Sequence, residues 1–129
     1  MSESVTFYLP LATSMTVQGF ANAAYAQRVT ITPETGPVMI FQGSGYYDTP
    51  IGQTVLTTPN SGSSPEGFRI TVNVDHSSDG VNWQPSDVDW MTLIVKYTSI
   101  YFVVSEDSTD DTWDDATTYF TWTTPPPPN

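Results

Sequence analysis

The 129-residue chain contains no cysteine and only three basic residues against fourteen acidic ones. The missing cysteines exclude a disulfide framework, a thiol nucleophile and a thiolate metal site. The formal net charge of −11 makes nucleic acids and anionic membranes poor partners, because both are negatively charged themselves. With no thiols and few basic groups, the side chains most available for binding are those that carry oxygen atoms.

Long apolar runs are also missing. No stretch approaches the roughly 18 apolar residues of a membrane span, and the opening M-S-E-S-V-T-F has neither the basic region nor the apolar core of a signal peptide. We therefore expect no membrane insertion and synthesis in the cytoplasm, with release or surface display only by a non-standard route.

Helical periodicity is absent, and alternation of apolar and polar residues takes its place. The clearest case is residues 68–75, where Phe68, Ile70, Val72 and Val74 face one side. Proline, glycine, asparagine and serine separate the runs, with turns or loops expected at 21–25, 43–50 and 76–89. The strand-like runs are 4–9, 15–20, 27–32, 38–42, 51–57, 68–75, 90–97, 100–105 and 116–123. This pattern predicts one all-β domain over residues 1–122, a β-sandwich of about nine strands with Greek-key connections and no significant helix, followed by a polyproline tail at 123–129.

The most unusual stretch is residues 105–116, S-E-D-S-T-D-D-T-W-D-D-A, between two predicted strands. It holds six of the fourteen acidic residues. Two carboxylates about 5 Å apart repel by roughly 0.8 kcal/mol in water and by more in a folded cleft. Solvent, protonation or a cation must relieve that repulsion, and calcium accepts about 6–8 oxygen ligands in flexible geometry. Either a calcium site or a solvated acidic loop fits the composition; an EF-hand does not, because the acids are paired, no glycine is present and the flanks are strands.

This stretch resembles the metal loop of the small bacterial two-calcium lectins that bind fucose and mannose, the fucose-binding lectin II family. The match runs without a gap from residue 105 to residue 122, and Phe20-Ala21-Asn22 resembles a second motif of that family. Weaker matches are Ile51-Gly52, the serine- and glycine-rich turn at 60–64 and Pro85-Ser86-Asp87. Residues 38–50 and 76–84 correspond poorly.

The resemblance implies a lectin in which sugar hydroxyls bind directly to protein-held calcium. The metal ligands it implies are Asn22, through its main-chain oxygen, and Glu106, Asp110, Thr112, Asp114 and Asp115. The sugar contacts it implies are Ala23, Ala24, Tyr25, Asp107, Ser108 and Thr109. It also implies mannose- or fucose-containing glycans as partners and a homodimer or homotetramer as the assembly.

Three departures from the family pattern affect the expected number of ions. Thr112 stands where the family has an aspartate that contacts both ions, while Asp114 replaces an asparagine. Ser108 replaces a glycine, which matters only where positive φ is required. The family ends on a glycine whose carboxylate reaches the partner's calcium, whereas here Pro125 occupies that place and four residues follow. We therefore expect one or two calcium ions.

The sugar preference is read from residues 23–25. Ala23 favours mannose by the resemblance, and the bulk of Tyr25 could either reshape the pocket or offer a stacking face to a sugar.

Other functions are also compatible with the sequence. The main alternative is a structural or assembly β-sandwich that has lost full calcium and sugar binding. His76, the nearby serines and Asp79 could form a catalytic triad. Paired carboxylates also catalyse hydrolysis in glycosidases. We nevertheless predict no enzyme, because the sequence provides no apolar pocket that would raise the pKa of a general acid. Tyr46 and Tyr47 form either a contact patch or an ordinary loop pair.

Overall fold

The computed structural model describes residues 3–107 and 115–126, and these residues form eight β-strands and no helix. The strands are β1 (Ser4–Leu9), β2 (Ser14–Pro33), β3 (Met39–Thr57), β4 (Phe68–Ser77), β5 (Gln84–Pro85), β6 (Asp87–Val95), β7 (Thr98–Glu106) and β8 (Ala116–Thr123). Within that part of the chain no helix is long and apolar enough to cross a membrane. The all-β prediction is confirmed.

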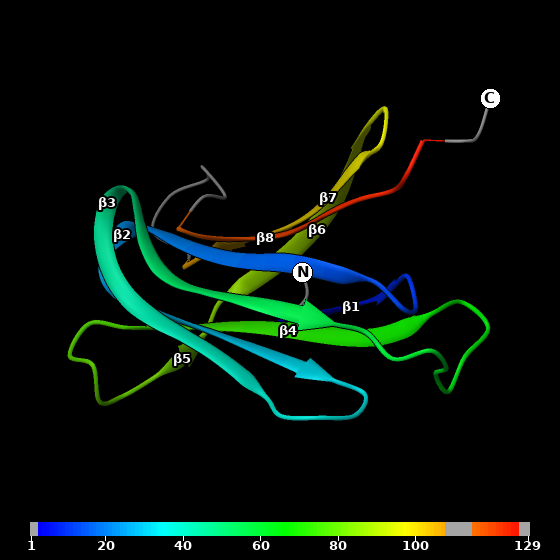
Figure 1. The fold of residues 1–129 in the computed structure, drawn as a ribbon. Helices are drawn as coiled ribbons and strands as arrows, with labels where there is room; N and C mark the ends of the chain where they lie inside the picture. Colours follow the sequence, from blue (N-terminus) through cyan, green and yellow to red (C-terminus); the bar gives the residue numbers. More distant parts are fainter. Residues whose placement is uncertain (1–2, 108–114, 127–129) are drawn as a thin grey trace.

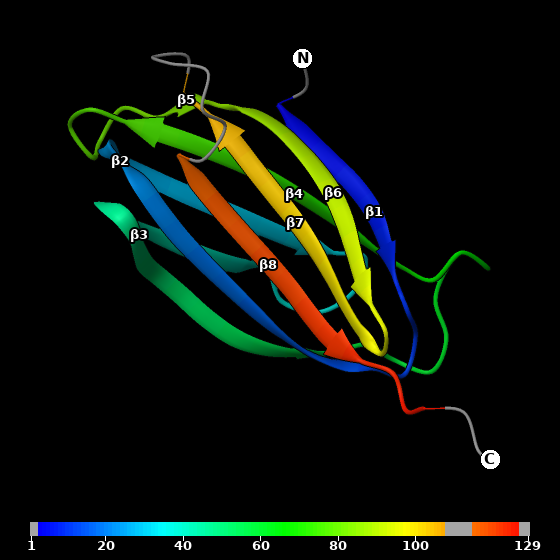
Figure 2. The ribbon, with the colours of Figure 1, turned by 90° about the horizontal axis from the view of Figure 1, so that it is seen from above.

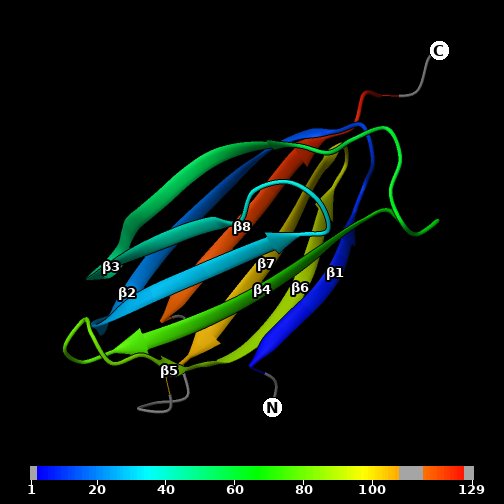
Figure 3. The ribbon, with the colours of Figure 1, turned by 90° about the horizontal axis from the view of Figure 1, so that it is seen from below.

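Two long bent strands connect the two layers of the sandwich. The first half of β2 pairs with β8 and the second half pairs with β4, while β3 follows β2 along both halves. One layer therefore contains β1, β4 and the second half of β2, and the other contains the first half of β2 with β8, β7 and β6 (Figures 2 and 3). Figure 1 shows β2 and β3 curving round one side of the molecule.

On the opposite side β1 approaches β6, so that the sheet is nearly closed. The rings of Phe7 and Trp90 stack there with centroids 4.9 Å apart. Alternating apolar side chains from both layers fill the space between them, as the strand pattern predicts. The buried core comprises Phe7, Leu9, Met15, Val17, Val29, Ile31, Phe41, Phe68, Ile70, Val72, Val74, Val88, Val103, Ala116, Phe120 and Trp122.

The segmentation predicted from the sequence is wrong at three places. Residues 21–25 and 43–50 are not turns or loops but continue β2 and β3, so four predicted strands become two. Both stretches carry register shifts that bend the pair without breaking it. In the predicted loop at 76–89, β4 continues to Ser77 and the short β5 pairs with it at Asp75 and His76.

At the C-terminal end β8 finishes at Thr123, as the sequence predicts. The N–H of Thr124 donates to the carbonyl of Tyr97 at 2.7 Å, which ties the next residue to the β6–β7 turn. The division into a domain of residues 1–122 and a tail of 123–129 stays a prediction.

Candidate functional site

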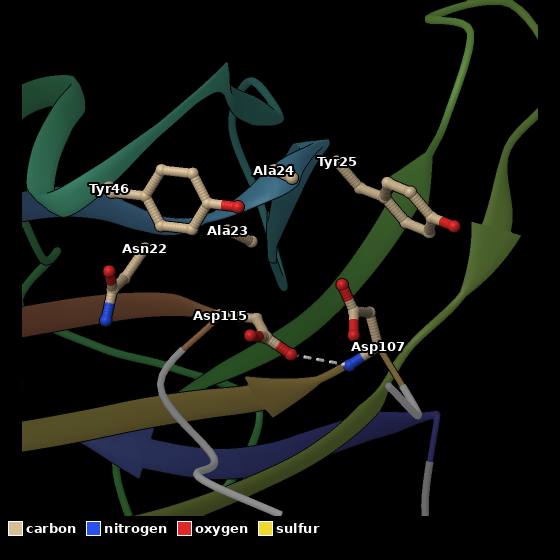
Figure 4. Close-up of a pocket in the computed structure, with 7 residues that line it drawn as sticks. All are labelled: Asn22, Ala23, Ala24, Tyr25, Tyr46, Asp107 and Asp115. Carbon is tan, nitrogen blue, oxygen red and sulfur yellow. Dashed lines mark hydrogen bonds between the residues drawn. The ribbon is translucent and has the colours of Figure 1, made fainter. Parts of the chain in front are cut away.

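The bend in β2 and β3 lies beside the ends of β7 and β8, and a pocket of about 260 Å³ opens between them. It is lined by Asn22, Ala23, Ala24, Tyr25, Tyr46, Asp107 and Asp115 (Figure 4). The lining contains two carboxylates and no basic residue. The sugar and metal positions predicted at 22–25, 107 and 115 therefore come together in space although they are far apart in sequence.

Irregular pairing between β2 and β3 explains how the tyrosines reach the pocket. Between the pairs Ala21–Thr49 and Ala23–Gly45, β3 has three residues where β2 has one. Between Ala23–Gly45 and the next pair, Gln27–Gly43, β2 has three residues where β3 has one. Each strand thus carries a bulge beside the pocket, and bulges commonly redirect side chains at functional sites.

Tyr46 belongs to the β3 bulge, and Figure 4 shows its ring beside Asn22 and Ala23. The bulge includes Tyr47 and Asp48 with φ of 62° and 56°, a conformation that non-glycine residues rarely adopt. The N–H of Tyr47 donates to the Asn22 side-chain oxygen at 2.9 Å, which holds the bulge against β2. The sequence left Tyr46 unassigned, because its glycine-rich surroundings predicted only a loop.

Tyr25 belongs to the β2 bulge, and a stacked histidine supports its ring. Its ring stacks on His76 with an interplanar angle of 15° and centroids 6.1 Å apart. His76 is fixed in turn by a 2.7 Å hydrogen bond between Nδ1 and Ser86 Oγ. Since Ser77 donates instead to Asp79 at 2.9 Å, His76 and its neighbouring serine do not form the relay of a catalytic triad.

The floor of the pocket is the place where β7 ends and β8 begins. The N–H of Asp115 donates to the Ser105 carbonyl at 3.2 Å, and that of Ala116 donates to Ser105 Oγ at 3.1 Å. The N–H of Asn22 donates to the Asp115 carbonyl at 2.9 Å, which fastens β2 to the same point. Hydrogen bonds therefore join the two ends of the acidic loop to each other and to β2.

Three carboxylates converge on this floor. Oxygens of Glu106, Asp107 and Asp115 lie within 4.8 Å of one another, and all three residues are buried. Within the described part of the chain these are the acidic side chains that lie close enough together to hold a metal ion. The N–H of Asp107 donates to Asp115 Oδ2 at 2.8 Å (dashed in Figure 4).

This clustering is electrostatically unfavourable when all three carboxylates are ionised and no cation is bound. Burial raises the pKa of the Asp115 carboxyl to about 8, and the nearby charges of Asp107 and Glu106 push it in the same direction against the hydrogen bond from the Asp107 N–H. Converging buried carboxylate oxygens are the donor set that calcium prefers. The residues present therefore fit a calcium ion.

The remaining predicted site residues lie outside the described part of the chain. They are the sugar contacts Ser108 and Thr109 and the metal ligands Asp110, Thr112 and Asp114. Among the described ones, Asp107 was predicted to touch sugar, yet it also belongs to the carboxylate group that could hold the metal.

The chain is similar to solved structures of bacterial lectins. The Ralstonia solanacearum high-affinity mannose-binding lectin is 28% identical, with a TM-score of 0.70 over 93% of this chain and 96% of that chain. The Chromobacterium violaceum lectin CV2L, solved with α-methyl-fucoside, is 26% identical, with a TM-score of 0.70 over the same shares. The C-terminal domain of the Burkholderia cenocepacia lectin BC2L-C is 26% identical, with a TM-score of 0.72 over 97% of this chain and all of that one.

No curated protein sequence matches the chain at a significant level. The family model of the fucose-binding lectin II (PA-IIL) proteins matches residues 7–124, which is most of the chain. Members of this family are lectins, proteins that bind carbohydrate without catalysing a reaction. The chain therefore belongs to the fucose-binding lectin II family.

Proposed function

We propose that this lectin binds mannose- or fucose-type monosaccharides in a calcium-dependent manner at the pocket between the β2–β3 bend and the β7–β8 ends. The observation that carries the proposal is the buried carboxylate group of Glu106, Asp107 and Asp115 at the floor of a pocket whose lining has no basic residue. Such a group is costly to bury unless a cation accompanies it.

The proposed ligands include Glu106 and Asp115 on the described floor and the main-chain oxygen of Asn22. The Asn22 side-chain oxygen accepts the Tyr47 N–H, so this side chain is used to position the β3 bulge. Asp110, Thr112 and Asp114 complete the proposed set, with one or two ions held. Bound calcium would neutralise the carboxylates and accept oxygen atoms from the sugar.

The protein's own side chains would orient the sugar. Neighbouring hydroxyls of a sugar donate hydrogen bonds well to carboxylates, and Asp107 lines the pocket where it could accept one. Ala23 and Ala24 are small and leave room above the floor. Tyr25 and Tyr46 offer aromatic surface on either side, which suits the apolar face of a sugar ring (Figure 4).

Both the relatives and the pocket support this class of monosaccharide. One relative is named as a mannose-binding lectin and another was solved with α-methyl-fucoside. Ala23 at the specificity position favours mannose over fucose for this chain. We also propose that the lectin acts as a homodimer or homotetramer.

Calorimetric titration of calcium into chelator-stripped protein tests the mechanism. We expect one or two ions per chain, followed by mannose and fucose binding that requires calcium. Glu106→Gln should weaken calcium binding strongly, since it removes a charge from the floor, whereas Glu66→Gln, on an exposed loop before β4, should leave it unchanged.

Absence of calcium binding in the unmodified chain would contradict the mechanism. That result would favour the alternative, a structural β-sandwich that keeps the fold but not the binding. Calcium binding without sugar binding would mean that the residues lining the pocket, and not the metal site, prevent sugar binding.

A further inference from the structure

Tyr47 is almost fully exposed although its main chain lies next to the pocket. It follows Tyr46 in the β3 bulge, and 95% of its surface is accessible to solvent. The Tyr47 N–H donates to the side-chain oxygen of Asn22, a pocket residue, at 2.9 Å. Thr49 Oγ1 donates to the Tyr46 carbonyl at 2.8 Å, which holds the bulge from its other side. Hydrogen bonds therefore fix the main chain of Tyr47 at the pocket while its ring faces solvent.

The conformation of this main chain is unfavourable for a tyrosine. The φ angle of Tyr47 is 62°, and that of the next residue, Asp48, is 56°. Aspartate is enriched among the non-glycine residues of this left-handed region, whereas a bulky side chain is rare there. Two consecutive residues with positive φ are typical of type I′ turns, in which glycine, asparagine and aspartate predominate. Since the exposed ring also adds little packing, the fold alone does not explain a tyrosine at position 47.

The rings of Tyr46 and Tyr47 form one aromatic surface that begins in the pocket and continues outside it. Their centroids are 6.4 Å apart with an interplanar angle of 56°, which is within the range of interacting aromatic pairs. Tyr46 lines the pocket and Tyr47 does not (Figure 4). Tyr47 therefore lies at the rim, where a ligand that extends beyond the pocket would pass.

The size of the pocket determines what lies beyond it. Its volume of about 260 Å³ is below the range of about 300–1,000 Å³ that is typical of pockets for drug-sized ligands. We expect one sugar unit to fill it. The next unit of a glycan must then lie outside the pocket, over the residues of its rim.

We propose that Tyr47 forms a subsite for the second sugar unit of an oligosaccharide whose terminal unit occupies the pocket. This inference rests on the proposed function, because the terminal unit has to bind in the pocket first. The apolar face of a sugar ring packs on an aromatic ring, and the phenolic hydroxyl both donates and accepts hydrogen bonds. A tyrosine with only two side-chain torsions also loses little conformational entropy on binding. The subsite therefore favours oligosaccharides over single sugars.

Calorimetric titration of sugars into the calcium-loaded protein tests the subsite. Methyl α-mannoside is compared with methyl dimannosides of each linkage, and methyl α-fucoside with fucosyl-galactosides. We expect at least one disaccharide to bind about 5- to 10-fold more tightly than its monosaccharide. Tyr47→Ala should remove this gain and leave monosaccharide affinity unchanged, because Tyr47 does not line the pocket. Tyr47→Phe should keep most of the gain, since it retains the ring.

Tyr97→Ala is the matched control. Tyr97 is also an exposed tyrosine, 46% accessible, but it precedes β7, whereas the pocket lies at the other end of that strand. This variant should keep the disaccharide gain. Tyr47→Gly separates binding from folding, because glycine adopts positive φ without steric cost. It should lose the gain and unfold at a urea concentration no lower than the unmodified chain.

The monosaccharide titrations distinguish failure of the subsite from failure of the proposed function. If no sugar binds in calcium, the proposed function is wrong and the subsite with it. Monosaccharide binding with no gain for any disaccharide overturns the subsite alone. So does a gain that Tyr47→Ala retains or that Tyr97→Ala also removes. A Tyr47→Gly variant that unfolds at a clearly lower urea concentration overturns it too, because the ring would then stabilise the fold.

Discussion

The Asp115 side chain couples the protein's stability to pH. In the metal-free protein burial raises the pKa of this carboxyl to about 8 from its ordinary value of 3.8. The folded state therefore holds a proton that the unfolded state releases near pH 4. The stabilising contribution is complete below the unfolded pKa and is lost as the pH rises toward about 8.

We expect the metal-free protein to melt at progressively lower temperature as the pH rises from about 4 to about 8. Calcium should reverse this trend, because it binds the ionised form and releases the proton. Thermal melts in chelator and in calcium across this pH range measure both effects.

Asp115→Asn provides the control, because asparagine has nearly the same shape and does not ionise. Without calcium its melting temperature should vary less with pH and should exceed that of the unmodified chain at neutral pH. With calcium it should gain little. An unchanged pH profile in this variant would show that another group carries the dependence.

Tyr46 is the pocket residue whose contribution to sugar affinity is easiest to isolate. We expect Tyr46→Ala to weaken sugar binding by about 1 kcal/mol, roughly fivefold, with calcium affinity unchanged, because the ring lines the pocket and the carboxylate floor stays intact. Tyr47→Ala is the neighbouring control, since Tyr47 is 95% exposed and does not line the pocket. Equal losses in the two variants would contradict a direct contact by Tyr46.

At the scale of elements, the long β2–β3 pair depends on two glycines that face each other. Gly19 of β2 pairs with Gly52 of β3, and the buried Phe41 ring occupies the space that their side chains would take. A Cβ at either glycine would overlap Phe41 ring atoms. The bend that positions Asn22 and Tyr46 begins directly beyond this pair.

We expect Gly52→Ala to destabilise the protein by about 1–3 kcal/mol, because the Phe41 ring must leave its packed position. Urea unfolding measures the change in the free energy of unfolding. Ser44→Ala, an exposed position on the same strand, should change it little. A Gly52→Ala variant as stable as the Ser44→Ala variant would mean that Phe41 repacks without cost.

At the scale of the whole molecule, calcium should stabilise the native fold. The floor of the pocket joins β2, β7 and β8, so an ion held there crosslinks strands of one layer to the bend that leads to the other. At calcium 100 times above its dissociation constant the gain is about 2.7 kcal/mol. For a domain of this size that corresponds to a rise in melting temperature on the order of 10 °C.

Thermal melts in calcium, and again after excess chelator, measure this rise and its reversal. Glu106→Gln should reduce the rise, and Glu66→Gln should retain it. A full rise in Glu106→Gln would place the ion away from the carboxylate floor.

Local alternation in the sequence determines the fold class. Phe68, Ile70, Val72 and Val74 alternate with polar residues and are all buried in β4, because side chains of a strand point alternately to opposite faces. The same local pattern could not separate a turn from a bulge at residues 21–25 and 43–50. Small residues and glycines suit both, and only pairing with a neighbouring strand decides between them.

The amino-acid sequence alone specifies the composition on which the proposed chemistry rests: many carboxylates, few basic residues and no cysteine, with six of the fourteen acids in residues 105–116 and a motif that resembles the fucose-binding lectin II family. The pairing of strands in three dimensions was needed to show that Tyr46 joins Tyr25 at the pocket and that Asp107 lies with Glu106 and Asp115 at its floor. Each of these depends on the register of strands distant in sequence. The hydrophobic pattern sets the register of the regular stretches, but the bulges between β2 and β3 exist only relative to the neighbouring strand, so the sequence of one strand does not reveal them.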